Sequence, residues 1–139
     1  MSKYTDLAME RRSRLNAEGR PVFNCCQTTV SVFAEDAGYD EAASLKAATY
    51  FRGGMQMGSV CGAITGGLMA LGLAGLEDRE TADAFCRRIR ENHDGMTDCG
   101  DLLKASAARG EVKKTFCDAM IRECIGCAEQ ILREKGKIG

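Results

Sequence analysis

The sequence predicts an all-α fold, a compact bundle of about six to seven helices around one buried, glycine-rich helix. Apolar residues recur at helical spacing along the chain, and no segment alternates apolar and polar residues over a useful length. Residues 53–76 carry no charged side chain, although 28% of the 139 residues are charged, and a helix that is apolar nearly all round is a buried one. The chain has one proline, which is typical of a helical protein with few rigid loops.

Three helices are predicted before the glycine-rich segment, because each has an apolar face and residues that start or stop a helix. Gly19 is expected to end the first helix, Asn24 to cap the second and Asp40 to cap the third. The predicted ranges are residues 3–18, 25–37 and 41–51.

The glycine-rich helix is predicted to start between residues 57 and 61 and to end near residue 75. Asp78 is expected to cap the next helix, and Thr97 or Asp98 the one after it. The predicted ranges for the remaining helices are 79–91, 98–108 and about 115–135. The last helix has an apolar seam formed by Phe116, Met120, Cys124, Cys127 and Ile131. The whole chain, residues 1–139, is expected to be a single domain.

Glycines recur at every fourth position in the glycine-rich segment, so on a helix they would form a stripe without side chains. The stripe consists of Gly54, Gly58, Gly62 and Gly66. Such a stripe lets another backbone approach closely, in a protein core or in a membrane. The segment is long enough to span a membrane, but its glycine content makes it only modestly hydrophobic, and its flanking helices are amphipathic. We therefore expect the central helix of a bundle, without a membrane span.

The charge pattern gives no sign of a nucleic-acid partner. The formal net charge is −1, with 19 basic and 20 acidic residues mixed along the chain. Charged residues between Lys3 and Arg14 interrupt the apolar run that an N-terminal signal peptide would need, so we expect a cytoplasmic protein. In a reducing compartment, cysteines are more often metal ligands or redox groups than parts of a disulfide framework.

Eight cysteines are many for a chain of this size, and four of them stand at or near predicted helix starts. The four are Cys25, Cys61, Cys99 and Cys117. The free amides and the dipole of a helix N-terminus favour an anion, so a thiol there is expected to have a lowered pKa. The thiolate is both the nucleophile of disulfide exchange and a ligand for a soft metal. Gly58 and Gly62 lie beside Cys61 and leave its sulfur open to a partner sulfur, a metal or a cofactor.

The other four cysteines are expected to be structural. They are Cys26, Cys86, Cys124 and Cys127. Cys124 and Cys127 match C-x-x-C, but no strand precedes them as in a redox motif, and the apolar seam already explains both. His93 is expected in a solvated loop. The methionines of the glycine-rich segment are expected to fill the core, namely Met55, Met57 and Met69.

Four elements of the sequence resemble a known family. Residues 58–67 are GSVCGAITGG, which matches the CGAxTG form of a GCAxxG motif, and residues 23–27, FNCCQ, resemble an asparagine–cysteine–x–glutamine element with Cys25 on the cysteine. Residues 98–103, DCGDLL, resemble a third element, and Cys117 stands where a fourth cysteine is expected. Over nearly its whole length the chain is thus similar to the redox-active proteins named after the pattern C_GCAxxG_C_C. Gly100 departs from that pattern, in which a larger polar residue, often arginine, is expected.

The resemblance implies a helical fold and a redox class, because the family is assigned its role mainly on its four cysteines. It does not imply a reaction. The positions of the cysteines relative to the predicted helix starts select the same four residues as the resemblance does.

Three functions remain open at this point. In the first, four converging cysteines are redox-active, either as ligands of an iron–sulfur cluster that passes electrons to an unidentified partner protein, or as thiol pairs that exchange disulfides. In the second, the same cysteines bind Zn²⁺ or Cu(I) without a redox role, although zinc sites usually use closely spaced cysteine pairs. In the third, the chain is a helical interaction protein whose glycine stripe forms a homodimer interface. We favour the first, because the resemblance and the helix starts select the same four thiols.

Overall fold

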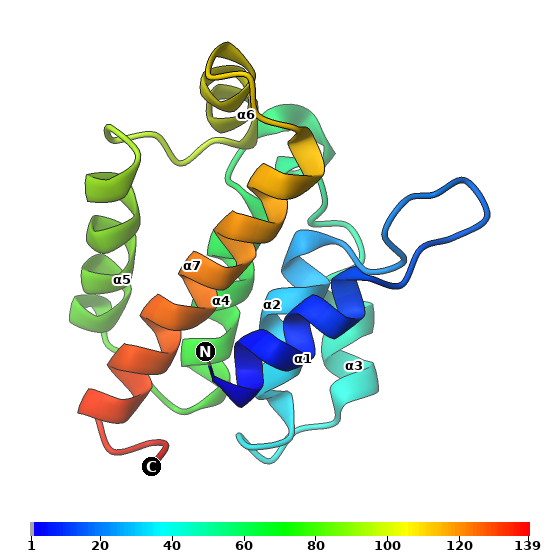
Figure 1. Ribbon diagram of the computed structural model, residues 1–139. Coiled ribbons are helices and arrows are strands. Elements are labelled where there is room, and N and C mark those ends of the chain that lie inside the picture. Colours follow the sequence, from blue (N-terminus) through cyan, green and yellow to red (C-terminus); the bar gives the residue numbers. More distant parts are fainter. Residues whose placement is uncertain (1) are drawn as a thin grey trace.

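Helix α4 (Gly62–Leu73) lies at the centre of the protein, whose residues 2–139 are described by a computed structural model (Figure 1). It packs most extensively against α2 (Cys25–Ala34) and also against α7 (Lys113–Glu134) and α5 (Arg79–Asn92). Between residues 2 and 139 there is no strand, and only two isolated bridges join extended residues. The all-α prediction is therefore confirmed.

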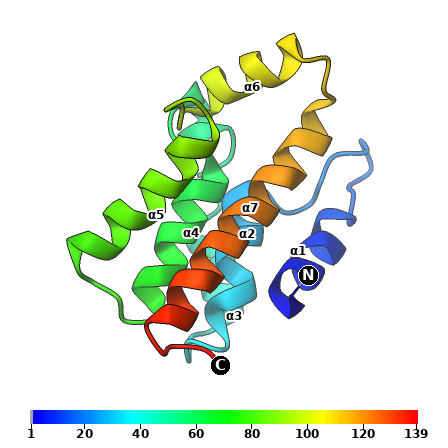
Figure 2. The same cartoon turned by 60° about the vertical axis from the view of Figure 1, so that its left-hand side comes forward.

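The remaining helices lie around this central group. α1 (Lys3–Arg12) packs on α2 and α7, and α3 (Glu41–Ala47) packs on α2. α6 (Cys99–Ala108) crosses one end of the bundle, where it contacts the start of α7 and a one-turn segment, η1 (Gly54–Gly58) (Figures 1 and 2).

Local caps set the start of the helices that carry the candidate site. The Asn24 side chain accepts a hydrogen bond from the amide of Gln27 at 2.8 Å, and the Gln27 side chain accepts one from the amide of Asn24 at 2.9 Å. The Asn24 side-chain amide also donates to the carbonyls of Ala48 and Thr49. This cap holds the start of α2 against the end of α3, and it agrees with the predicted N-cap.

The glycine-rich segment differs from the prediction in its first half. Residues 53–58 form a tight left-handed turn, with positive φ at Met55 and Gln56 as well as at three glycines, and α4 begins only at Gly62. A Cβ atom on Gly54 would lie 2.2 Å from the carbonyl oxygen of Ser59, so only glycine fits there. The expected stripe of four glycines on one helix is therefore wrong: Gly54 and Gly58 shape the turn, and Gly62 and Gly66 lie on α4.

Two glycines of α4 permit close packing in the core. A Cβ on Gly66 would lie 2.8 Å from Cβ of Thr29 on α2, and a Cβ on Gly67 would lie 2.4 Å from the ring of Phe85 on α5. The seam of α7 faces this core as predicted, with all of its members buried except Cys127, which is half-buried. In the part of the chain that the structure describes, no helix combines the length and the apolar character that crossing a bilayer requires.

The first helix is shorter than predicted. α1 ends at Arg12 and not at residue 18, and the chain then turns back through the bridge between Leu15 and Pro21. Arg11 and Arg12 are both buried, so the end of α1 is fixed by the tertiary contacts of two charged side chains. Local sequence signals do not report such contacts, which explains the error.

Candidate functional site

The four cysteines selected from the sequence occupy the starts of four helices. Cys25 is the first residue of α2, Cys61 is the residue before α4, and Cys99 is the first residue of α6. Cys117 is in the second turn of α7, because that helix begins at Lys113 and not at residue 115 as predicted. The four thiols lie close enough for the charge on one to change the pKa of its neighbours.

Cys25 and Cys117 interact more strongly than any other two of the four cysteines. Each of these thiols changes the pKa of the other, and both side chains are half-buried. The thiol of Cys25 lowers the pKa of Cys117 to about 7, with help from the charges of Arg12 and Lys113 and against the effect of burial. The thiol of Cys117, together with burial, raises the pKa of Cys25. At neutral pH, Cys117 is thus about half ionised, whereas Cys25 keeps its proton.

Cys61 and Cys99 are held together by backbone pairing. The amide of Cys61 donates to the carbonyl of Thr97 at 2.9 Å, and the amide of Cys99 donates to the carbonyl of Ser59 at 2.6 Å. These bonds flank an antiparallel bridge between residues 60 and 98. The bridge thus brings the segment before α4, which ends at Cys61, against the segment that leads into Cys99 at the start of α6.

Burial, and not the helix dipole, has the largest effect on the pKa values of Cys61 and Cys99. Cys61 is only 7% exposed, and burial raises its pKa to about 11 although the amides of Ala63 and Ile64 at the start of α4 act in the opposite direction. Burial also raises the pKa of Cys99. The expected lowering of pKa at helix starts is therefore wrong for these two thiols and for Cys25. It holds in direction for Cys117, where a neighbouring thiol and two cations are the cause.

The two glycines predicted to leave Cys61 open serve packing in the structure. A Cβ on Gly62 would lie 2.6 Å from the carbonyl oxygen of Phe51 and 3.3 Å from Cβ of Cys25, so α4 starts in close contact with α2. Gly58 has a φ of 71° and passes close to Gly100, from which its Cβ would be 3.9 Å away. Their role toward a cofactor stays a prediction.

Sequence reasoning missed a cluster of charges beside the Cys25–Cys117 pair. Arg12 lies on α1, and its Nε donates to Asp118, the residue after Cys117, at 2.8 Å. Lys114 binds the other carboxylate oxygen of Asp118 at 2.7 Å. The available signal was the spacing of Arg12 from Tyr4 and Ala8, which puts all three on one face of α1.

The structure changes the interpretation of several other side chains. His93 is not solvated: its side chain is 15% exposed, and Nε2 lies 2.7 Å from a carboxylate oxygen of Glu123. Met55 and Met57 are exposed, so the prediction that they fill the core is wrong. Met69 is half-buried, and its sulfur lies 3.5 Å from Sγ of the fully buried Cys26.

The remaining structural cysteines follow the expected pattern in part. Cys124 is fully buried in the α7 seam, whereas Cys86 and Cys127 are half-buried. Burial raises the pKa of the Cys127 thiol, although the charge of Arg88 on α5 acts in the opposite direction.

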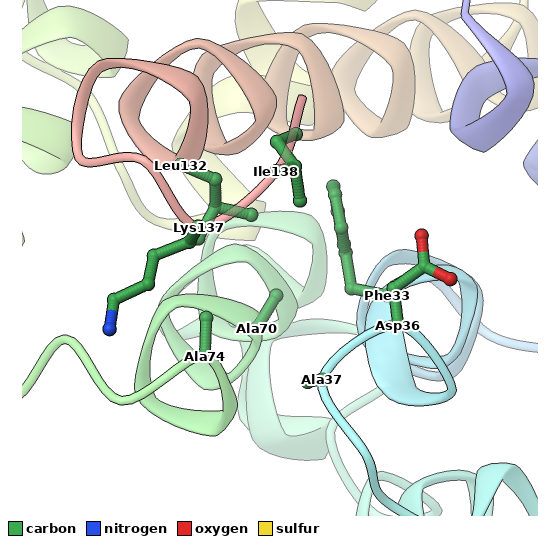
Figure 3. A pocket seen from close by; sticks show the side chains of 8 residues that line it. All are labelled: Phe33, Asp36, Ala37, Ala70, Ala74, Leu132, Lys137 and Ile138. Atoms are coloured by element: carbon green, nitrogen blue, oxygen red, sulfur yellow. The ribbon is translucent and has the colours of Figure 1, made fainter.

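A cavity of about 150 Å³ lies near the other end of α4 and is lined by no cysteine (Figure 3). Ala70 and Ala74 of α4, Phe33 of α2 and Leu132 of α7 form its apolar walls, and Figure 3 shows the charged groups of Asp36 and Lys137 on opposite sides of it. The cavity thus offers no group of reactive side chains that would compete with the cysteines as a functional site.

The described side chains do not form the donor set of a metal ion. Across residues 2–139, no three His, Cys, Asp or Glu side chains are grouped as the ligands of a metal ion would be. The four thiols are the right chemical type for an iron–sulfur cluster, but their arrangement in this structure is not that of a ligand set. We therefore derive no step through a metal.

Comparison with known proteins yields one match. Residues 23–131 match a family model described as "Putative redox-active protein (C_GCAxxG_C_C)". Neither the curated proteins nor the solved structures include a significant match to the chain.

Proposed function

The chain belongs to the C_GCAxxG_C_C family of redox-active proteins, and we propose that it works by thiol–disulfide exchange through Cys25 and Cys117. The observation that carries the proposal is that Cys117 lies beside both Cys25 and the buried Arg12–Asp118 ion pair, where Cys25 and the charge of Arg12 lower its pKa to about 7. A thiol with a pKa near the ambient pH is the best attacking group, because it is largely ionised and still strongly nucleophilic.

The two thiols divide the work of the exchange. The Cys117 thiolate attacks one sulfur of a partner disulfide, the disulfide bond breaks, and the partner's other sulfur leaves as a thiolate that takes the proton of Cys25. Cys25 then attacks the sulfur of Cys117, the mixed disulfide breaks, and the second partner sulfur leaves and is protonated by water. Two electrons pass to the partner, and the protein holds a Cys25–Cys117 disulfide; the reverse sequence oxidises a partner dithiol.

Cys61 and Cys99 are proposed as the second thiol pair. Support comes from the backbone bonds that pair the segment ending at Cys61 with the segment leading into Cys99, and from the effect of the Cys99 charge on the pKa of Cys61. Their raised pKa values keep both as thiols at neutral pH. In this proposal Cys61 and Cys99 are oxidised only by exchange with the Cys25–Cys117 disulfide, which they thereby reduce to two thiols.

The test is to locate the disulfides that form in graded redox buffers. Reduced protein is equilibrated with glutathione at increasing fractions of glutathione disulfide, free thiols are blocked, and peptides are identified by mass spectrometry. We expect the Cys25–Cys117 disulfide in the wild type and in Cys26→Ser, and its absence from Cys25→Ser. The proposal fails if oxidation leaves Cys25 and Cys117 as free thiols while other cysteines pair.

The alternative is that the same thiols ligate an iron–sulfur cluster for electron transfer: four cysteines are a complete set in number and chemical type, although the structure does not group them as ligands. Protein purified without oxygen separates the two proposals. Stoichiometric iron and sulfide bound through Cys25, Cys61, Cys99 and Cys117 would replace the disulfide proposal. Bound zinc or copper without sulfide would support the non-redox metal module instead.

A further inference from the structure

Helix α1 precedes the family match, which covers residues 23–131, yet it reaches the Cys25–Cys117 pair. Two arginines anchor the end of this helix, and both are buried: Arg11 is 6% exposed and Arg12 is 5% exposed. A buried guanidinium is costly unless its charge and its donors are matched, so each side chain must have a specific partner.

The partners of the two arginines differ. Arg11 binds Ser31 of α2 and Glu41 at the start of α3, and it is not among the main groups that shift the pKa of Cys25 or Cys117. Arg12 points to the cysteine pair. Its Nε donates to Asp118 at 2.8 Å, and its Nη1 donates to the carbonyl of Phe23 at 2.9 Å.

The two hydrogen-bond acceptors of Arg12 are close in sequence to the two cysteines. Asp118 directly follows Cys117, and Phe23 stands two residues before Cys25. One guanidinium thus ties the segment that leads into α2 to the second turn of α7. A planar group with several fixed donors suits this task better than an ammonium, which acts as a single point charge.

We infer that Arg12 is a positioning residue for the Cys25–Cys117 dithiol, holding both cysteine-bearing segments together and supplying the positive charge that stabilises the sulfur anion. The inference rests on the function proposed above. It assigns to α1, which lies outside the matched region, control over how readily the pair reacts.

The electrostatic part of this role has a definite sign. Arg12 favours the thiolate of Cys117, and Asp118 opposes it. Loss of Arg12 should therefore slow the attack by Cys117, whereas loss of the Asp118 charge should speed it. General loosening of the structure would change both variants in the same direction, so the opposite signs separate the two explanations.

The experiment compares Arg12→Gln with Arg11→Gln, a matched control in which the same helix loses a buried arginine whose partners are Ser31 and Glu41. The probe is 5,5′-dithiobis(2-nitrobenzoic acid), whose reaction with reduced protein is followed at pH 7 with Cys117 resolved by peptide mass spectrometry. We expect Arg12→Gln to slow the reaction of Cys117 about two- to fivefold, Arg12→Lys to recover most of the rate, and Arg11→Gln to stay within about twofold of the wild type.

Asp118→Asn keeps the proposal testable if Arg12→Gln does not fold, and it should raise the rate about twofold. Equal rates in the two glutamine variants, or a slower reaction in Asp118→Asn, would overturn the role of Arg12. These results are independent of the proposed function, which fails instead if wild-type protein forms no Cys25–Cys117 disulfide in the glutathione buffers.

Discussion

Replacing Cys25 by alanine tests the origin of the reactive thiolate. The effect of the Cys25 thiol is the largest of those that lower the pKa of Cys117 to about 7, from an ordinary value of 9.0. A complete return to the ordinary pKa would reduce the ionised fraction at pH 7 from about one half to about one hundredth, a factor of about 50. The remaining thiolate would be more basic and about six- to tenfold more nucleophilic, because reactivity rises with pKa at a slope of roughly 0.4–0.5. The net expectation is a five- to eightfold slower reaction of Cys117 at pH 7 as the upper limit, because Arg12 and Lys113 remain.

The assay is alkylation by iodoacetamide between about pH 5.5 and 9.5. Trypsin releases Cys117 in the peptide of residues 115–122, which holds no other cysteine, so its modification is measured separately. In the wild type we expect half-maximal reactivity near the pKa of about 7, and in Cys25→Ala a shift toward 9. Cys26→Ala is the control, since it removes the thiol that follows Cys25 in the sequence and leaves both Cys25 and Cys117 unchanged. An unchanged midpoint in Cys25→Ala, or a wild-type midpoint near 9, would refute the reasoning.

Two further predictions concern stability. Gly67→Ala should lower the free energy of unfolding by about 1–3 kcal/mol, because the added methyl group would lie 2.4 Å from the buried ring of Phe85. Gly72→Ala, on the same helix with nothing within 4 Å, should instead stabilise by up to about 1 kcal/mol, and urea unfolding of both variants checks the contrast. Burial raises the pKa of Cys61 to about 11 and of Cys26 to about 12, so the folded state binds these protons more tightly than the unfolded state above pH 9, and stability should fall as the pH rises. Between pH 8 and 10 each thiol should contribute a loss of about 1 kcal/mol, and Cys26→Ala should lose less than the wild type; equal losses in the two proteins would contradict this.

Much of the fold could be predicted because helix boundaries are set by local chemistry. Asn24, Asp40 and Asp78 cap the helices that they were expected to cap, and their side chains accept hydrogen bonds from amides in the first turn. The turn at residues 53–58 could not be predicted from the same signals. Glycine permits both a close helix contact and a left-handed turn, and nothing in the sequence marks Met55 as left-handed.

The sequence selects candidate cysteines, but it does not predict the electrostatics around them. The position of Cys25 after an N-cap and of Cys61 in a recognisable motif identified candidates, whose redox role stays a prediction. Their pKa values depend on burial and on contacts between distant segments, and these decide the direction of each shift. Arg12 lies 106 residues from its carboxylate partner, so only the folded structure reveals that it belongs beside Cys117.

The left-handed turn explains how the glycine-rich segment serves the cysteines. Had residues 57–61 been helical, the carbonyl of Ser59 and the amide of Cys61 would have bonded within the helix and not to the segment before α6. The turn frees both groups, and they bind the amide of Cys99 and the carbonyl of Thr97. Two non-glycine residues in left-handed conformation cost about 1–3 kcal/mol each, a strain that persists only where the surrounding structure fixes it. Here Gly54, which packs without a Cβ against Ser59, and the bridge to the residue before α6 fix it, so the departure from the helix is what pairs the segment ending at Cys61 with the segment leading into Cys99.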